Sequence, residues 1–466
     1  MIKLYFFTFK KFFKSIGFNR SNYKLNLNLS APVLHKVSRS RFLHIIPLTL
    51  LILISISTSC NTTEPPSNQT FLLKLEDISC TEAWVQLTTN NIQLPATINL
   101  LKNDTIAQVI NLSYKDTLLY IDSLLPNQTY KILVAMQQYN NVSNELSVRT
   151  MDTTSHNFTW QTRTFGGQAG SCALYDVAII DENNIWAVGE IYMLDSLGRP
   201  DPNAYNAAHW NGQSWELKKI RTNACGGVDY PPIKAIFAFS SNDILFAHID
   251  GSISHFNGIG FTNDCSLITQ LNGSANKIWG ISKDDYYVVS GNGFIAHYQN
   301  GNWTRIESGT TTNINDAWGI TNKQNNTIVY CAVSSFFTPG DKKILKLING
   351  KVDSVNWSRD LRLYSAWTNN ENILYVCGEG VFVNKFSTWS EINLQQVGTN
   401  SIRGNNLNDI FIAGDYGFKS HFNGSTWQIY NNNYLKGYSR LSFKGNIVTI
   451  AGNYQGKAIV EIGRRN

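Results

Sequence analysis

Short runs in which hydrophobic and polar residues alternate fill most of the chain, and after residue 157 they recur as one repeated pattern. The clearest copy is 408–427, NDIFIAGDYGFKSHFNGSTW, and a second is 285–303, DYYVVSGNGFIAHYQNGNW. Each copy holds two alternating stretches separated by turns rich in Gly and Asn, which is typical of half-buried antiparallel strands. The pattern therefore predicts a repeated β-structure.

The repeat has a nearly constant length. The residues that open the equivalent strand lie about 44 positions apart on average, which is the length of a four-stranded propeller blade. These residues are Ile185, Ile244, Tyr286, Ile328, Ile373, Ile410 and Ile447. The sequence thus predicts an all-β protein whose segment 157–466 is a β-propeller of seven four-stranded blades.

Further features of the repeat assign its strands. Trp279, Trp318 and Trp367 lie in the expected inner strands, where we expect core packing rather than ligand platforms. Asn-Gly pairs between the third and fourth strands predict two-residue type I′ hairpins. They occur at 211–212, 257–258, 300–301, 349–350 and 423–424.

The two ends of the repeat region complement each other. The last blade ends after its third strand, 458–462, whereas 157–165 before the first blade matches a fourth strand. Pairing these segments would close the ring and leave no exposed sheet edge.

A smaller module precedes the propeller. Residues 71–150 read as short alternating strands, with Trp84 on an expected inward face. The segment 124–135, LLPNQTYKILVA, resembles the corner of a fibronectin type III domain, in which the Tyr, here Tyr130, bonds back to the backbone. The resemblance implies a fibronectin type III-like sandwich that serves as a spacer, joined to the propeller by a linker at 151–156.

The propeller repeat itself resembles secreted bacterial propellers related to the photosystem II assembly factor and to sialidase-like Asp-box families. It is also similar to bacterial surface lipoproteins with such a propeller, some of which are labelled glucosyltransferase. This resemblance is specific for architecture and implies little about activity.

The positive charge of the chain is concentrated at its start. The chain has 39 Lys and Arg against 33 Asp and Glu, a net charge of +6, and residues 1–59 contain nine basic and no acidic residues. The remainder has 30 basic against 33 acidic residues, a net charge of −3, so we expect no nucleic-acid partner.

The same segment resembles an export signal. Arg39 and Arg41 precede an apolar run, 43–56, and then Ser57-Thr58-Ser59-Cys60. This order resembles a bacterial lipobox with Ser57 at the usual Leu position, which implies a leader at 1–59, a lipidated Cys60 with a tether at 60–70, and an outer-membrane or cell-surface location. An uncleaved anchor or a plain signal peptide is the alternative, and we expect translation to start after residue 1.

The remaining cysteines and the histidines suggest structure rather than chemistry. Cys225 and Cys265 lie in loop-like sequence and are our candidate disulfide, whereas no Cys or His spacing predicts a metal site. A catalytic group is needed once, but His209, His255, His297 and His421 share one blade position, which favours packing. Asp243 and Asp409 recur before second strands, where we expect bonds to local backbone.

Two insertions break the repeat and give the candidate ligand site. Residues 190–208 lengthen the turn between the second and third strands of blade 1, and 221–232 joins blades 1 and 2, so both should lie on one rim. They contribute carboxylates, an Arg and tyrosines, which suit a carbohydrate or peptide ligand; the alternative is that they only plug the funnel. The candidate residues are Asp195, Arg199, Asp201, Tyr205, Asp229 and Tyr230.

Three function classes remain open. The first is a non-catalytic surface protein, a monomer without cofactor, that binds a glycan or protein. The second is a carbohydrate-active enzyme for glycosyl transfer or hydrolysis; a sialidase-like site would need clustered Arg residues and a Tyr–Glu pair, but Arg163, Arg305 and Arg403 are isolated. The third is an outer-membrane assembly factor.

Overall fold

The computed structural model describes residues 70–136, 141–222, 225–271, 273–335, 339–430 and 433–466. Cys60, the leader and most of the tether lie outside these residues. The regular secondary structure of the described chain is almost all β-strand, with one four-residue helix, α1 (Ile268–Leu271), and one 3-10 turn, η2 (Asp415–Gly417). Within the described residues no helix has the length and apolar character needed to span a membrane.

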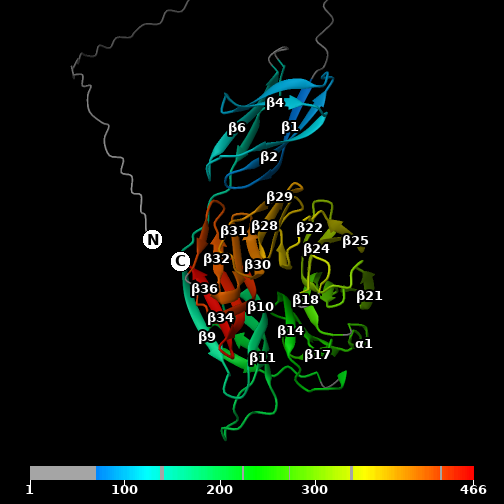
Figure 1. Ribbon diagram of the computed structural model, residues 1–466, viewed down its shortest axis with the longest axis vertical. Helices are drawn as coiled ribbons and strands as arrows, with labels where there is room; N and C mark the ends of the chain where they lie inside the picture. The colour runs from blue at the N-terminus through cyan, green and yellow to red at the C-terminus, as the bar shows by residue number, and fades with distance from the viewer. Residues whose placement is uncertain (1–69, 137–140, 223–224, 272, 336–338, 431–432) are drawn as a thin grey trace, which may run out of the picture. The chain divides into compact units, whose positions relative to one another are not determined.

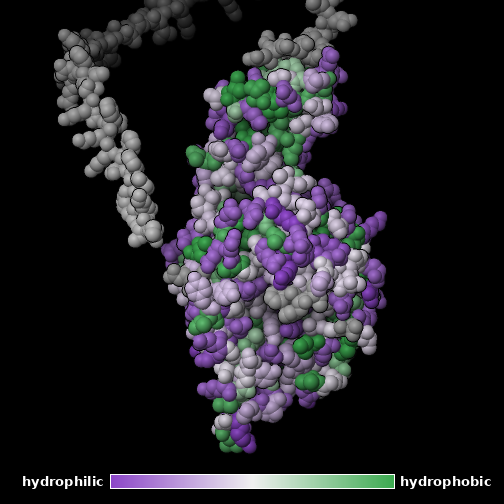
Figure 2. Space-filling model, viewed as in Figure 1, coloured by the Kyte–Doolittle hydropathy of each residue, from purple (hydrophilic) through white to green (hydrophobic). Residues whose placement is uncertain are grey.

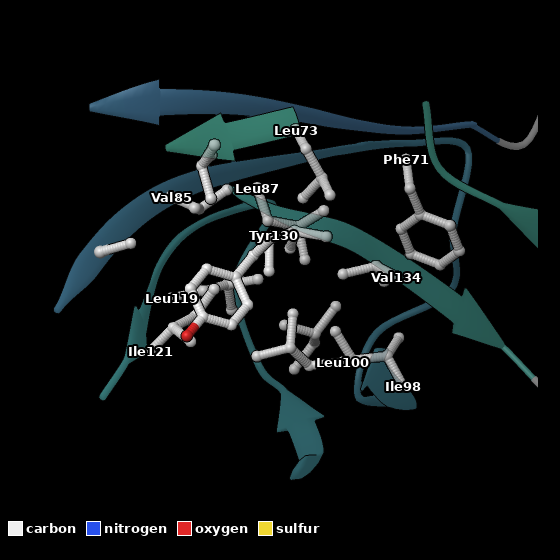
Figure 3. Close-up of a cluster of buried hydrophobic side chains, with 14 of the residues drawn as sticks. Phe71, Leu73, Val85, Leu87, Ile98, Leu100, Leu119, Ile121, Tyr130 and Val134 are labelled. Atoms are coloured by element: carbon white, nitrogen blue, oxygen red, sulfur yellow. The ribbon is translucent and has the colours of Figure 1, made fainter. Parts of the chain in front are cut away.

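The first module is a two-sheet sandwich. One sheet has the order β1-β2-β5, and the other has the order β4-β3-β6-β7, with β8 also paired to β6. The strands are β1 (Thr70–Ile78), β2 (Ala83–Asn90), β3 (Ala96–Lys102), β4 (Thr105–Leu112), β5 (Asp116–Ile121), β6 (Thr129–Met136), β7 (Asn141–Val142) and β8 (Leu146–Arg149). Alternate side chains of both sheets fill the space between them, as Val85, Leu100 and Val134 do in Figure 3.

Two predictions about the sandwich have different outcomes. The Tyr130 hydroxyl accepts a hydrogen bond from the backbone N–H of Leu125 (2.8 Å), which is the expected closure of the corner. The prediction for Trp84 is wrong. Ala83 and Val85 face the sandwich core, so Trp84 lies on the opposite face of β2, next to Tyr120 of β5 at 5.7 Å between ring centres.

The repeat region forms seven four-stranded antiparallel sheets, as predicted. In blades 1 to 6 the strands follow the chain from the inner to the outer edge. Blade 1 consists of β10 (Ala173–Asp181), β11 (Asn184–Ile191), β12 (Tyr205–Trp210) and β13 (Trp215–Lys218), and blade 2 of β14 (Ile233–Ser240), β15 (Asp243–His248), β16 (Ile253–Phe256) and β17 (Phe261–Asp264). Blade 3 consists of β18 (Ala275–Ser282), β19 (Asp285–Ser290), β20 (Phe294–Gln299) and β21 (Asn302–Glu307), and blade 4 of β22 (Ile314–Thr321), β23 (Thr327–Val333), β24 (Lys343–Ile348) and β25 (Lys351–Val355). Blade 5 consists of β26 (Leu363–Trp367), β27 (Ile373–Gly378), β28 (Gly380–Lys385) and β29 (Thr388–Glu391), and blade 6 of β30 (Thr399–Asn406), β31 (Asp409–Gly414), β32 (Lys419–Phe422) and β33 (Trp427–Ile429).

Blade 7 is completed by the start of the propeller. Its sheet has the order β34-β35-β36-β9, and the strands are β34 (Lys436–Lys444), β35 (Ile447–Tyr454), β36 (Lys457–Arg465) and β9 (Phe158–Phe165). β9 pairs with β36 over its whole length, from Phe165 opposite Ala458 to Phe158 opposite Arg465 (Figure 1). The predicted closure of the ring is therefore confirmed.

Two glycines of the inner strands have a packing role. A Cβ on Gly319 would lie 2.6 Å from the Trp279 ring of the preceding blade, and one on Gly404 would lie 2.7 Å from the Trp367 ring. The glycines therefore leave room for a tryptophan of the neighbouring blade. Trp279 and Trp367 are buried, in agreement with the prediction that these rings belong to the core.

The backbone conformation of each Asn-Gly pair depends on the length of the loop that contains it. At 300–301 and 349–350 the loops have two residues, and both residues have positive φ, as a type I′ turn requires. At the three other sites the strand register leaves four residues in the loop, and only the Gly has positive φ. There the Asn caps the turn instead: the Asn211 Oδ1 accepts bonds from the N–H groups of Gln213 and Ser214.

The repeated histidines hold the second and third strands together. His255, His297 and His421 each bond the Asp that opens the second strand of the same blade, at 2.6–2.8 Å, and His209 bonds Asn184 at 2.9 Å. The packing role is as predicted. The role predicted for Asp243 and Asp409 is wrong, because among the described residues their carboxylates pair with these imidazoles rather than with local backbone N–H groups.

Candidate functional site

The two insertions lie on one end of the propeller. In each antiparallel blade, the turn between the second and third strands is at the same end as the entry to the inner strand. The insertions therefore share this end, which we call the insertion face; they cover 192–204, between β11 and β12, and 219–232, between β13 and β14.

The first insertion is a hairpin that is stabilised by its own side chains. Leu194 and Pro200 form a β-bridge, and the Asp195 carboxylate accepts bonds from the backbone N–H groups of Leu197 and Arg199. Arg199 also forms a salt bridge with Asp195 (3.0 Å). These bonds lower the pKa of Asp195, and the bond from the Arg199 backbone N–H contributes most. Both residues are thus used inside the turn, and Leu197 is 73% exposed at its tip.

A lysine joins the two insertions. The Lys219 ammonium bonds Asp201 at 2.7 Å and lies 4.6 Å from the centre of the Tyr205 ring and 6.0 Å from that of Tyr230. The hydrogen bond from Lys219 lowers the pKa of Asp201. The structure thus brings together three of the six candidate residues, around a lysine that the sequence analysis did not select.

The second insertion is fixed by covalent and ionic links. Cys225 and Cys265 form a disulfide with their Cα atoms 5.3 Å apart, which ties the insertion to the end of blade 2. Asp229 forms a salt bridge with Arg221 (3.0 Å), and the backbone of Thr222 bonds the carbonyl of Asp229. These links tie the described residues of the insertion to one another and to blade 2.

Inside the rim, every inner strand carries a β-bulge at the same position. The residues at this position form a ring, which we call the bulge ring. They are Tyr175, Lys234, Asn276, Asn315, Tyr364, Asn400 and Ser439. The three asparagines bond a carbonyl of the next inner strand, Ile314, Leu363 and Tyr438 respectively, each at 2.9 Å.

The bulge ring departs from this pattern beside the insertions. Tyr175 and Tyr192 both donate hydrogen bonds to Glu190, one to each carboxylate oxygen, the second at 3.2 Å. The Lys234 ammonium lies 3.4 Å from the centre of the Tyr175 ring. Burial, followed by the bonds to Glu190, raises the pKa of Tyr175, so this hydroxyl keeps its proton. The sequence analysis missed this group of four residues, which we call the mouth cluster.

Deeper in the channel, ion pairs cross between inner strands. Lys277 of blade 3 contacts both carboxylate oxygens of Asp176 of blade 1, at 2.9 and 2.7 Å. Arg403 of blade 6 binds Asp316 of blade 4 through two parallel bonds of 2.9 and 2.8 Å. Each pair passes over one blade that has a small residue at the matching position, Ala235 or Ser365. We call these two pairs the axial plug.

A third cation crosses above the axial plug. The Arg440 guanidinium of blade 7 donates hydrogen bonds to the carbonyls of Asn400 (2.8 Å) and of Asn315 in blade 4 (2.6 Å). Among the described residues no carboxylate lies within 4.0 Å of it. On the other side of the plug, a cavity of about 260 Å³ is lined by Lys277, Arg403 and apolar side chains that include Trp318 and Phe237.

Several observations bear on catalysis. The Cys331 and Cys377 thiols are buried, and burial raises the pKa of Cys377 to about 12, so it is not a thiolate at neutral pH. Within the described part of the chain, no three His, Cys, Asp or Glu side chains are grouped as metal ligands. Tyr175 and Glu190 do form a Tyr–Glu pair, but the cation in contact with it is Lys234 rather than an arginine cluster.

Comparison with known proteins gives likeness in fold only. No family model and no curated protein matches the chain. Similar solved structures are YCF48 bound to D1 peptide (15% identity, 67% of this chain and 99% of that chain, TM-score 0.49) and the WD40 β-propeller domain of Doa1 (13%, 66% and 98%, 0.48). A third is YCF48 from Cyanidioschyzon merolae (14%, 65% and 98%, 0.46). The propeller assignment rests on the strand pairing described above.

Proposed function

We propose that this protein is a non-catalytic, lipid-anchored protein of the outer membrane or cell surface whose propeller binds a carbohydrate or protein ligand on the insertion face. In this proposal the fibronectin type III-like sandwich is a spacer between the anchor and the propeller. The protein acts as a monomer and needs no cofactor.

One observation carries the proposal: both insertions are fixed in place, yet polar and aromatic side chains on them stay accessible. The Cys225–Cys265 disulfide and the Lys219 contacts limit the motion of the loops before any ligand is present. Binding to such a surface loses less conformational entropy than binding to mobile loops. The surface of the propeller seen in Figure 2 is mostly hydrophilic, with hydrophobic residues in small groups. That surface suits a glycan, whereas the exposed Leu197 would suit a protein partner.

Replacing Asp229 and Tyr230 with alanine is expected to weaken ligand binding about tenfold or more, because both residues lie in the second insertion on the insertion face. The measurement is binding of the purified protein to a glycan array and to a library of immobilised peptides. Asp284→Ala, in the turn between β18 and β19 at the other end of the propeller, is the matched control and should bind like the wild type. Unchanged binding by the double variant, or turnover of nucleotide sugars or sialosides, would overturn the proposal.

The anchor has its own test. Cys60→Ser is expected to move the protein from the membrane fraction to the soluble fraction, because the thiol that receives the lipid is lost. Intact-mass analysis of wild-type protein should show a mature chain that begins at residue 60 with a diacylglyceryl group. Cys80→Ser, which leaves Cys60 intact, is the control. An unmodified protein that starts at Met1 would contradict both the anchor and the export route.

A further inference from the structure

Lys234 lies in the bulge ring beside the insertions, and its ammonium has no polar partner among the described residues. Its ammonium carries three N–H donors, and its contact among the described residues is the face of the Tyr175 ring. No carboxylate of the described chain lies within 4.0 Å of it. Burial lowers the pKa of Lys234, while Glu190 opposes this effect. The side chain is only half-buried, so its N–H donors can also bond a ligand from solution.

Glu190 is the carboxylate expected to pair with Lys234, but its oxygens are already used. One oxygen accepts a bond from the Tyr175 hydroxyl and the other from the Tyr192 hydroxyl. The two tyrosines therefore hold the carboxylate in place, and they leave the ammonium of Lys234 directed at a ring rather than at an anion. Among the described residues, the Lys234 ammonium therefore has no direct counter-ion at the insertion-face end of the inner strands.

The charge beneath Lys234 has the same sign. Asp176 neutralises Lys277 and Asp316 neutralises Arg403, so the axial plug has no net charge. Arg440, which crosses the channel above the plug, adds a positive charge whose hydrogen bonds go to carbonyl groups. An anionic group at this end of the inner strands would therefore meet Lys234, with Glu190 nearby, and the field of Arg440 below it.

We propose that Lys234 binds the carboxylate of an acidic sugar in the ligand, while Glu190 and the hydroxyls of Tyr175 and Tyr192 bond the hydroxyl groups of the same ring. This inference rests on the proposed function, since it names the ligand class of the insertion face. Charge-assisted hydrogen bonds from an ammonium to a carboxylate are stronger than neutral ones, so this contact should dominate selectivity.

The chemistry of the bulge ring favours a glycan over a peptide. All seven of its residues are polar or carry a hydroxyl: two tyrosines, one lysine, three asparagines and one serine. A peptide anchors itself mainly through apolar side chains that enter pockets, and the ring contains no aliphatic residue to line one. A sugar presents hydroxyl groups over most of its surface, which match these donors and acceptors.

Lys234→Met tests the assignment, because methionine keeps much of the side-chain volume and removes the charge. The probes are oligogalacturonate and sialyl-oligosaccharides, each compared by calorimetry with its carboxyl-reduced counterpart. Wild-type protein should bind at least one acidic probe about tenfold or more tightly than the reduced form, and the preference should fall as salt rises. Which probe shows the preference identifies uronate or sialate as the source of the carboxylate. Lys234→Met should bind both forms of that probe equally, whereas Lys234→Arg should keep the preference.

Lys351→Met, which removes an exposed lysine at the start of β25, is the matched control and should keep the wild-type preference. The inference is overturned if wild-type protein does not distinguish acidic from reduced probes, if Lys234→Met keeps the preference, or if only peptides with a free carboxylate bind. These failures differ from failure of the proposed function. Loss of binding in Asp229→Ala/Tyr230→Ala with an unchanged preference in Lys234→Met would leave the insertion face as the binding site and reject the acidic sugar.

Discussion

Lys277→Met is expected to lower the free energy of unfolding by about 3–5 kcal/mol, because it leaves the Asp176 carboxylate buried without a counter-ion. The side chain of Asp176 is 1% exposed and that of Lys277 is 6% exposed. Besides Lys277, Asp176 accepts hydrogen bonds from the backbone N–H groups of Ile236 and Val177. These neutral donors stabilise the carboxylate only in part, so the effect should be among the largest of any single substitution in the propeller.

Urea unfolding followed by tryptophan fluorescence measures this effect. Lys283→Met, at an exposed lysine whose partner is Asp284, is the control and should change stability by less than about 0.5 kcal/mol. The double variant Lys277→Met/Asp176→Leu should recover most of the loss, because a buried pair can often be replaced by apolar residues at little cost. A double variant as unstable as the single one would show that the axial plug is itself a net stabiliser.

The propeller could be predicted closely from the sequence because its stability comes from a local pattern that is repeated. The sequence signals for strands, turns and blade length recur in every repeat, so a weak signal in one repeat can be interpreted from the others. Closure by 157–165 was also predictable, since a ring with one missing strand needs a complementary strand elsewhere in the chain. The Trp84 prediction failed because alternation gives two faces to a strand and does not say which one meets the core.

The axial plug and the mouth cluster could not be predicted in the same way. Lys277 and Asp176 are 101 residues apart and pair across a blade, so no local spacing connects them. A signal was nevertheless present: Asp176, Lys277, Asp316 and Arg440 occupy one position of the inner-strand repeat, where blades 2, 5 and 6 have Ala or Ser. Arg403 stands where Trp279 and Trp318 stand in their blades, and in blade 7 Phe443 occupies the position at which Gly319 leaves room for Trp279.

The candidate residues in the insertions were predicted as a group, but their roles differ. Asp195 and Arg199 stabilise a turn, Asp201 and Tyr205 meet at Lys219, and Asp229 pairs with Arg221. Residue type and loop position do not show which charges are already neutralised by neighbours. Lys234 escaped notice for the opposite reason, since a single lysine in a strand is ordinarily a solvated side chain.

Arg403→Met is expected to destabilise the protein at neutral pH by about 3–5 kcal/mol, because it leaves Asp316 of blade 4 without its counter-ion. Burial alone would raise the pKa of Asp316, but Arg403, with smaller contributions from Arg440 and Lys277, outweighs it and lowers the pKa to about 2. Because an unfolded Asp titrates near about 3.9, this ion pair stabilises the fold above about pH 4. The stabilisation is lost as the pH falls toward 2. Removing Arg403 should raise the pKa of Asp316.

The difference in unfolding free energy between wild type and Arg403→Met is expected to be smaller at acidic pH than at neutral pH. Urea unfolding at pH 7 and at pH 3 should give a clearly smaller difference in unfolding free energy at the lower pH, since protonated Asp316 no longer needs a counter-ion. Arg403→Lys should be intermediate, because an ammonium keeps the charge but cannot form the two parallel bonds. Arg305→Met, which removes an exposed arginine that pairs with Glu307, should leave stability unchanged at both pH values. A gap that is equally large at both pH values would mean that Arg403 acts by packing, against the Trp318 ring 4.7 Å from its guanidinium, rather than by its charge.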